Sequence, residues 1–334
     1  MEEFSPSPAA VVFYNRNWTE LAVFEIIPSR DNRLDPVSRL LDLNSIDFDR
    51  IRLWLQSCSK ADLALQPHEK TDYLPGFRLI HCRSRKITEP SQKYLYVALS
   101  YVWGRELPEE SQSRRFPQTI EDAIRVCLKL GFEYLWIDRY CIDQENYEDK
   151  HAQISRMDVI YSEASLVIIA AAGEDPTYGL PGAGSQSRTP QQSIKLRDCT
   201  LLQTFPRVEH ELEASTWTSR EWTLQEGHFG TRKLIFPDCQ VTYICKHGIC
   251  NESVSPRMTW DSSPRDWRLA DEHECGRQRS LWRLDAYFSF EDSHPQKRIT
   301  ESEFRKWRII EEFTKRKLSY DSDVYNTIRG IFSS

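Results

Sequence analysis

Three apolar runs in the middle of the chain, rich in residues that favour strands, constrain the fold most. They are "YLYVALSYVW" (94–103), "YLWIDRYCI" (134–142) and "SLVIIAAA" (165–172). Each run is almost continuously apolar, which is typical of strands covered on both faces, as in parallel sheets. The segments between the runs are long enough to hold a crossover helix. The sequence therefore predicts a parallel sheet with right-handed helical crossovers, which is an α/β fold.

Two amphipathic segments supply the expected crossover helices. They are "FPQTIEDAIRVCLKLGF" (116–132) and "EDKHAQISRMDVIYSEA" (148–164). In the first, Thr119 is a candidate N-cap and Gly131 is expected to end the helix. Further helices are expected at 47–61 and 304–318, and the chain stops soon after the second, which indicates a shortened chain or a small family member.

Polar and aromatic side chains follow the first two predicted strands where each one ends. The carboxyl ends of parallel strands share one edge of a sheet, and ligands bind in the crevice there. Asp138 has a simpler possible role, because an aspartate after a strand often accepts backbone N–H bonds in a turn. We nevertheless predict that these side chains surround one pocket and that they bind a substrate; the candidates are Ser100, Tyr101, Trp103, Gly104, Asp138, Asp143 and Gln144.

A further candidate lies in "SREWTLQEG" (219–227), where Trp222 and Glu226 are four positions apart. If this segment is helical, the two side chains share one face, with Ser219 at the cap. A glutamate on a helix is usually only solvated. The apolar neighbours of Glu226 indicate a buried segment, however. A buried carboxylate is expected either to pair with a donor or a cation, or to have a functional role. We predict that Glu226 reaches the same pocket, with Arg220 near enough to pair with a carboxylate or a phosphate.

Charge and length exclude several classes of function. The 334 residues carry a formal net charge of −6, so no basic surface for nucleic acid or an anionic membrane is indicated. No apolar run approaches the roughly 18 residues that span a bilayer. The start, "MEEFSPSPAA", lacks the features of a secretory signal.

Nine cysteines without regular spacing favour reduced thiols in a cytoplasmic protein. Cys141 lies near the predicted edge, but no particular histidine is paired with it in sequence, which favours an inert buried thiol over a nucleophile. The segment "CQVTYICKHGIC" (239–250) does not have the spacing of a zinc knuckle, so no metal site is predicted.

Four motifs resemble, in order and spacing, the fungal heterokaryon-incompatibility (HET) domain: "YVALSYVWG", "YLWIDRYCIDQEN", "AQISRMDVIYSEASLVIIAAAGED" and "SREWTLQE". One departure is Glu221, where the family more often has glycine or alanine. The resemblance implies a HET domain over residues 91–240, an N-terminal segment (1–90) packed on that core, and a partly helical C-terminal elaboration (241–334).

The HET family is similar to Toll/interleukin-1-receptor (TIR) domains, which have a flavodoxin-like parallel sheet with helices on both faces. Some TIR domains self-assemble and hydrolyse NAD through one glutamate. The resemblance therefore implies a cell-death effector of non-self recognition in a filamentous fungus, with Glu226 as the catalytic residue. NAD or a related nucleotide would be its substrate rather than a bound cofactor, and it would self-associate and engage a signalling partner protein.

The chemistry of NAD cleavage fits the predicted residues. Breaking the nicotinamide–ribose bond passes through an oxocarbenium-like state, which one well-placed carboxylate stabilises. Trp103 or Trp222 could stack on a base or on nicotinamide, and Asp138 or Gln144 could hold a ribose hydroxyl. Two alternatives stay open: a non-catalytic TIR-like adaptor that signals by self-assembly through the same edge, and a thiol hydrolase that uses Cys141.

Overall fold

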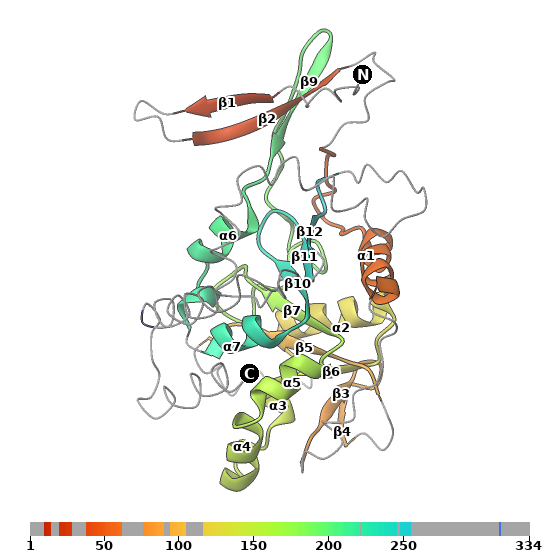
Figure 1. Cartoon of the computed structure of the whole chain (residues 1–334), viewed down its shortest axis with the longest axis vertical. Coiled ribbons are helices and arrows are strands. Elements are labelled where there is room, and N and C mark those ends of the chain that lie inside the picture. Colours follow the sequence, from red (N-terminus) through yellow and green to blue (C-terminus); the bar gives the residue numbers. More distant parts are fainter. Residues whose placement is uncertain are drawn as a thin grey trace, which may run out of the picture.

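The computed structural model describes residues 10–14, 20–28, 38–61, 76–89, 94–104, 116–220, 222–245, 248–254 and 314. These residues form an eight-stranded sheet and a separate four-stranded sheet, with helices packed around the larger one (Figure 1). The expected helix at 304–318 lies almost wholly outside the described residues, and so does Glu221.

The larger sheet is mixed, with a parallel centre. Its strands, in spatial order, are β12 (Gly248–Asn251), β11 (Thr242–Cys245), β10 (Arg232–Phe236), β7 (Leu166–Ala170), β5 (Tyr96–Ser100), β6 (Tyr134–Trp136), β3 (Leu79–His81) and β4 (Lys86–Thr88). Strand β5 pairs in parallel with β6 and with β7, and β7 pairs in parallel with β10. The outer pairings are antiparallel. The predicted parallel arrangement of the three apolar runs is therefore confirmed.

Burial on both faces explains why these runs are continuously apolar. Every residue of β5 and of β7 is buried. Because β6 and β7 lie on opposite sides of β5, right-handed crossovers place the helices after β5 and after β6 on opposite faces. Two helix pairs supply the cover: α1 (Phe48–Ala61) with α2 (Gln118–Leu130), and α5 (Met157–Glu163) with α7 (Trp222–Phe229).

The second apolar run leaves the sheet earlier than expected. Strand β6 stops at Trp136, and Asp138–Cys141 form the single helical turn α3. The reason is local, because a carboxylate oxygen of Asp138 accepts the backbone N–H of Arg139 at 2.7 Å. An aspartate that bonds its own following backbone favours a turn over a strand.

The helix expected at 148–164 is two helices. They are α4 (Tyr147–Ile154), whose N-cap Asn146 accepts the backbone N–H of Asp149, and α5. Between them the Ser155 hydroxyl donates to the Ala152 carbonyl at 2.8 Å. Such side-chain bonds compete with the helical ladder, which is consistent with the break.

The predicted N-cap of α2 was wrong, whereas its predicted end is confirmed. The helix is preceded by Pro117, which makes no capping bond, and it ends at Gly131 in the left-handed conformation. Thr119 lies inside the first turn, where its hydroxyl accepts the backbone N–H of Gly179 at 3.1 Å. The first turn of α2 therefore anchors the loop after β7 instead of capping itself.

The smaller sheet is antiparallel and lies at one end of the molecule (Figure 1). Its order is β1 (Ala10–Tyr14), β2 (Glu20–Pro28), β9 (Cys199–Thr204) and β8 (Ser193–Lys195). Helix α6 (Val208–Ala214) and the 3-10 turn η3 (Trp217–Ser219) then lead the chain back to α7. None of the described helices is long and apolar enough to cross a membrane.

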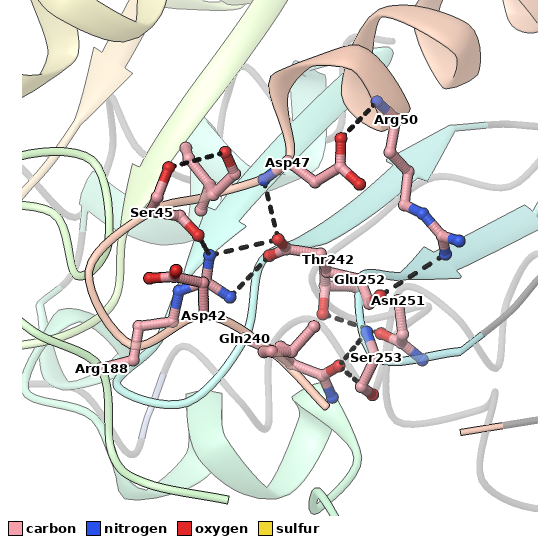
Figure 2. Close-up of polar contacts among 12 residues, drawn as sticks. Asp42, Ser45, Asp47, Arg50, Arg188, Gln240, Thr242, Asn251, Glu252 and Ser253 are labelled. Atoms are coloured by element: carbon pink, nitrogen blue, oxygen red, sulfur yellow. Dashed lines mark hydrogen bonds and ion pairs between the residues drawn. The ribbon is translucent and has the colours of Figure 1, made fainter. Parts of the chain in front are cut away.

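A buried ion-pair network joins distant segments beside the larger sheet (Figure 2). Arg188 Nη1 lies 2.9 Å from Glu252 Oε2, and their side chains are 1% and 2% exposed. The backbone N–H of Asp47 donates to Glu252 Oε1, and Arg39 Nε donates to the Glu252 carbonyl. The network therefore ties the segment before α1 and the loop at Arg188 to the chain just after β12.

Candidate functional site

The carboxyl end of β5 carries a buried hydroxyl between an indole and a carboxylate. Ser100 ends the strand and is fully buried. Its Oγ donates to Glu226 Oε2 and accepts a hydrogen bond from Trp217 Nε1 at 2.7 Å. Glu226 is 126 positions from Ser100 in sequence, and α7 brings it to this edge of the sheet.

The turn that enters α7 aims Glu226 inward. The Thr223 hydroxyl donates to the carbonyls of Trp217 and Arg220, at 2.8 Å each. Trp217 is fully buried and fixes the turn against β5 through Ser100. The predicted cap was wrong: Ser219 lies in η3, and its hydroxyl donates to a carbonyl within that turn.

A second group of side chains surrounds Trp103, just beyond β5. Trp103 Nε1 donates to both carboxylate oxygens of Asp138, at 3.1 and 3.0 Å. The guanidinium carbons of Arg139 and Arg220 lie 5.6 and 6.0 Å from the centroid of the Trp103 ring. Arg220 Nη1 also donates to the carbonyl of Tyr101 at 2.6 Å. Asp138 therefore points toward Trp103, and two cations flank them.

Charges in this region influence one another. Burial raises the pKa of Asp138 to about 6, although the Arg139 N–H, the Arg220 charge and the Trp103 N–H each oppose the change. Tyr161 is fully buried, and its pKa is raised well above the usual value by burial and then by the negative charges of Glu226 and Asp138. The charges of Glu226 and Asp138 both act on Tyr161. The Ser100 and Trp103 groups therefore belong to one electrostatic environment.

One buried hydroxyl here has no hydrogen-bond partner among the described residues. It belongs to Tyr101, whose side chain is 2% exposed. Burial raises the pKa of Tyr101, and the Asp138 carboxylate raises it further, so the hydroxyl stays protonated near that carboxylate. Buried polar atoms are rarely left unpaired, which makes this hydroxyl a ready contact for a ligand or a water molecule.

Two further predicted residues also lie at this edge. Gln144 Nε2 donates to the backbone carbonyl of Asp138 at 3.2 Å. Gly104 has φ +70°, and a Cβ added to it would lie 2.9 Å from atoms of Asp175 and Pro176. A glycine at this position allows the loop after β7 to approach the end of β5.

Two other predicted residues are not joined to this group by a contact. Asp143 accepts the backbone N–H of Glu145 at 3.1 Å and so stabilises its own turn. Trp222 is the half-buried first residue of α7, and no ring contact joins it to Trp103 within the described part of the chain.

Sequence reasoning missed three residues of this region: Arg139, Tyr161 and Trp217. The sequence did offer an indication of Arg139, because this residue follows Asp138 directly at the predicted edge of the sheet. Tyr161 and Trp217 had none, since one lies on a helix packed over the sheet and the other in the irregular segment before α7.

Cys141 is fully buried, and burial raises its pKa to about 12, so it is unsuited to act as a nucleophile. Among the described residues no group of three or more His, Cys, Asp or Glu side chains could hold a metal ion. His247, which belongs to the segment 239–250, lies outside the described residues.

Comparison with known proteins identifies the middle of the chain. A family model described as "Heterokaryon incompatibility protein (HET)" matches residues 96–226. Residues 96–226 therefore match the HET domain family. The match runs from the first residue of β5 to Glu226, so it includes both groups of side chains described above. No solved structure matches.

A curated relative carries the same family name. It is "Heterokaryon incompatibility protein 6, OR allele" of Neurospora crassa, which is 34% identical over 93 residues. The alignment covers 22% of this chain and 14% of that protein, so the similarity spans a small part of the relative's length.

Proposed function

We propose that this HET-domain chain is a fungal cell-death effector of non-self recognition that hydrolyses NAD through Glu226. The family match and the name of the Neurospora relative support the role in incompatibility. One observation carries the catalytic part: a buried carboxylate at the carboxyl edge of a parallel strand, held by Ser100 and close to a cationic, aromatic group.

The strand order supports a TIR-like core. The parallel strands β6, β5, β7 and β10 follow the order 2-1-3-4 when numbered along the chain, as in flavodoxin-like sheets. In such sheets a ligand binds where the order reverses, which here is between the carboxyl ends of β5 and β7. Ser100 ends β5 at this point, with Glu226 bonded to it.

The proposed reaction needs little beyond one carboxylate. Nicotinamide leaves as a neutral molecule with the electron pair of the glycosidic bond, and Glu226 stabilises the positive charge that develops on the ribose. Water then attacks the ribose carbon and loses a proton, which yields ADP-ribose. No metal and no covalent nucleophile enter this scheme.

The second group suits the rest of a dinucleotide. Arg139 and Arg220 place two guanidinium groups beside the Trp103 ring, and guanidinium groups are well suited to bind the oxygens of a pyrophosphate. Asp138 and the unpaired Tyr101 hydroxyl are suited to ribose hydroxyls. Trp103 already has both guanidinium groups near its ring, so a base that stacks there has to displace one of them.

Access to the carboxylate requires a conformational change. Glu226 is 3% exposed and Ser100 is fully buried. The side chains that cover this carboxylate therefore have to move before NAD can enter, as lids do in many enzymes. We propose that self-association drives this opening, so activity should rise steeply with protein concentration.

The test is release of free nicotinamide from NAD by the purified chain at low and high protein concentration. Glu226→Gln keeps the shape and removes the charge, so release should fall by about 100-fold or more. Glu163→Gln is the matched control, because Glu163 is also a buried glutamate but lies near Tyr96 at the opposite end of β5. Undiminished release by a folded Glu226→Gln protein would remove Glu226 from the mechanism.

The alternative is a non-catalytic adaptor, and the burial of the site favours it. A carboxylate that is covered and bonded to Ser100 can serve folding alone. The two functions separate in fungal cells that express the protein. Cell death that survives Glu226→Gln, with no NAD cleavage by either protein, favours the adaptor.

A further inference from the structure

Within the described residues, two pairs of cysteine side chains lie close enough to influence each other's ionisation. One pair joins Cys58 of α1 to Cys245, the last residue of β11. The other joins Cys82, just after β3, to Cys127 of α2. None of the four forms a disulfide with another of the described residues. The same chain therefore holds two thiol pairs whose surroundings can be compared.

A guanidinium group distinguishes the first pair. Arg232 Nε donates to Cys58 Sγ at 3.3 Å, and Arg232 lies opposite Cys245 in the antiparallel ladder of β10 and β11. Cys58 and Cys245 keep 5% and 7% of their surface exposed, whereas Cys82 and Cys127 are fully buried. The first pair thus combines two neighbouring cysteines with a cation, and it is slightly less buried than the second pair.

The two environments have opposite effects on the thiols. A hydrogen bond from Cys245 lowers the pKa of Cys58 to about 6 against the effect of burial, with further contributions from Tyr243 and Arg232. Burial and the neighbouring Cys82 raise the pKa of Cys127 well above its usual value. Near neutral pH Cys58 is therefore mostly thiolate and Cys127 is a thiol. Thiolates are the form that reacts with oxidants.

We propose that Cys58 and Cys245 form a reversible disulfide when the protein meets a hydroperoxide. The Cys58 thiolate attacks the terminal peroxide oxygen and the O–O bond breaks, which gives a sulfenic acid; hydroxide leaves from hydrogen peroxide and alkoxide from an organic hydroperoxide. The Cys245 sulfur then attacks the Cys58 sulfur, the S–O bond breaks, and the proton of Cys245 leaves with the oxygen as water. The two sulfurs lose two electrons and the hydroperoxide gains them.

This disulfide would link α1 covalently to β11, and these two elements lie on either side of the matched HET segment in the sequence. Cys58 precedes residues 96–226 and Cys245 follows them. Linking α1 to β11 closes a long loop, which restricts the unfolded chain. The thermal midpoint of unfolding should therefore rise by about 5 °C or more on oxidation and return on reduction. This inference does not depend on NAD cleavage, because every readout is a thiol or a stability measurement.

The experiment treats the purified full chain with increasing hydrogen peroxide, alkylates the remaining thiols at set times, and reads cross-linked peptides by mass spectrometry. The Cys58–Cys245 link should form at least about tenfold faster than any Cys82–Cys127 link, given the difference in thiolate content. Dithiothreitol should remove it. Equal rates at the two pairs, or a link from Cys58 to a third cysteine, would overturn the proposal.

Variants test the order of the steps. Cys245→Ser should leave Cys58 as a sulfenic acid that dimedone labels, and Arg232→Gln should slow its formation several-fold. Cys127→Ser, the matched control, should form the Cys58–Cys245 link at the normal rate. Labelling of Cys245 in Cys58→Ser, with none of Cys58 in Cys245→Ser, would assign the attack to the wrong sulfur and contradict the proposed order.

Discussion

At the scale of single residues, two glycines with similar backbone conformations differ in their surroundings. Gly104 has φ +70° and Gly131 has φ +89°, both in the left-handed region that side chains rarely adopt. A Cβ on Gly131 would meet nothing within 4 Å, whereas a Cβ on Gly104 would meet Asp175 and Pro176 at 2.9 Å. The pair therefore separates backbone strain from steric contact.

Gly131→Ala should lower the free energy of unfolding by about 1 kcal/mol, the cost of the left-handed conformation alone. Gly104→Ala should cost about 2–3 kcal/mol, because the loop after β7 must also move. Urea unfolding of the two variants measures the difference. If both variants lost the same free energy of unfolding, the loop after β7 would be able to move away from a Cβ at position 104 without an energetic penalty.

Lys233 gives the stability a dependence on pH. Its side chain is 3% exposed, and burial lowers the pKa of its amine to about 7. Between about pH 7 and 10 the unfolded chain holds this proton and the folded chain does not, so folding releases it and stability rises with pH. The contribution is about 2 kcal/mol between pH 7 and pH 9.

Lys233→Met should remove that part of the slope, as measured by urea unfolding at pH 7 and pH 9. Lys129→Met is the control, because Lys129 is exposed in the last turn of α2 and should leave the slope unchanged. Identical slopes for the wild type and Lys233→Met would show that the buried amine keeps its ordinary pKa.

The sequence could predict which residues belong to the candidate site, including Glu226, but not the contacts that hold Glu226 in place. Ser100, Trp103 and Asp138 follow apolar strands, and strand direction alone places their positions at one edge of the sheet. The bond from Ser100 to Glu226 depends on how Trp217 seats the turn before α7, which is a tertiary contact without a local pattern. The unpaired state of the Tyr101 hydroxyl could not be predicted either, because a sequence does not show which buried polar groups lack a partner.

At the scale of elements, the Arg188–Glu252 pair holds three separate segments together. Removing one partner of a buried pair leaves an uncompensated charge or an unpaired polar group, at about 3–5 kcal/mol. Arg188→Met should therefore destabilise the fold by that amount in urea unfolding, since Glu252 then loses its main cation.

The control for this prediction is the pair Arg85–Glu121, whose side chains are 44% and 20% exposed. Glu121→Gln should cost less than about 1 kcal/mol. If Arg188→Met also cost less than about 1 kcal/mol, solvent would have to reach Glu252, and the network would contribute little to the free energy of unfolding.

Elements with a single dominant pattern were the predictable ones. The three apolar runs, α1 and the end of α2 at Gly131 followed from periodicity and glycine chemistry. The break at Ser155 and the early end of β6 depended on short side-chain bonds to the backbone. Hydrophobic periodicity does not report such bonds.

At the scale of the whole molecule, the matched HET segment does not contain the complete sheet. Strand β10, which pairs with β7, and strand β3, which pairs with β6, both lie outside residues 96–226. Helix α1, which packs on α2, lies outside as well. Without these elements, edges and an apolar helix face would meet water.

A fragment of residues 96–226 should therefore show no cooperative thermal unfolding by circular dichroism, whereas the full chain should show it. A sharp, reversible transition in the fragment would establish that the HET segment folds by itself and that the flanking strands are additions.

The network around Glu252 also bears on when the protein can finish folding as it is made. Arg39 bonds to a carbonyl 213 positions later in the chain. At a synthesis rate of about 5–20 residues per second, that partner emerges roughly 10–40 s after Arg39. Strands β5 and β7 are synthesised well before then, and the edge of β7 stays unpaired until β10 has been made. A nascent chain thus passes through a period in which that edge of β7 has no partner strand, and codon usage between β7 and β12 becomes a means of setting how long the period lasts.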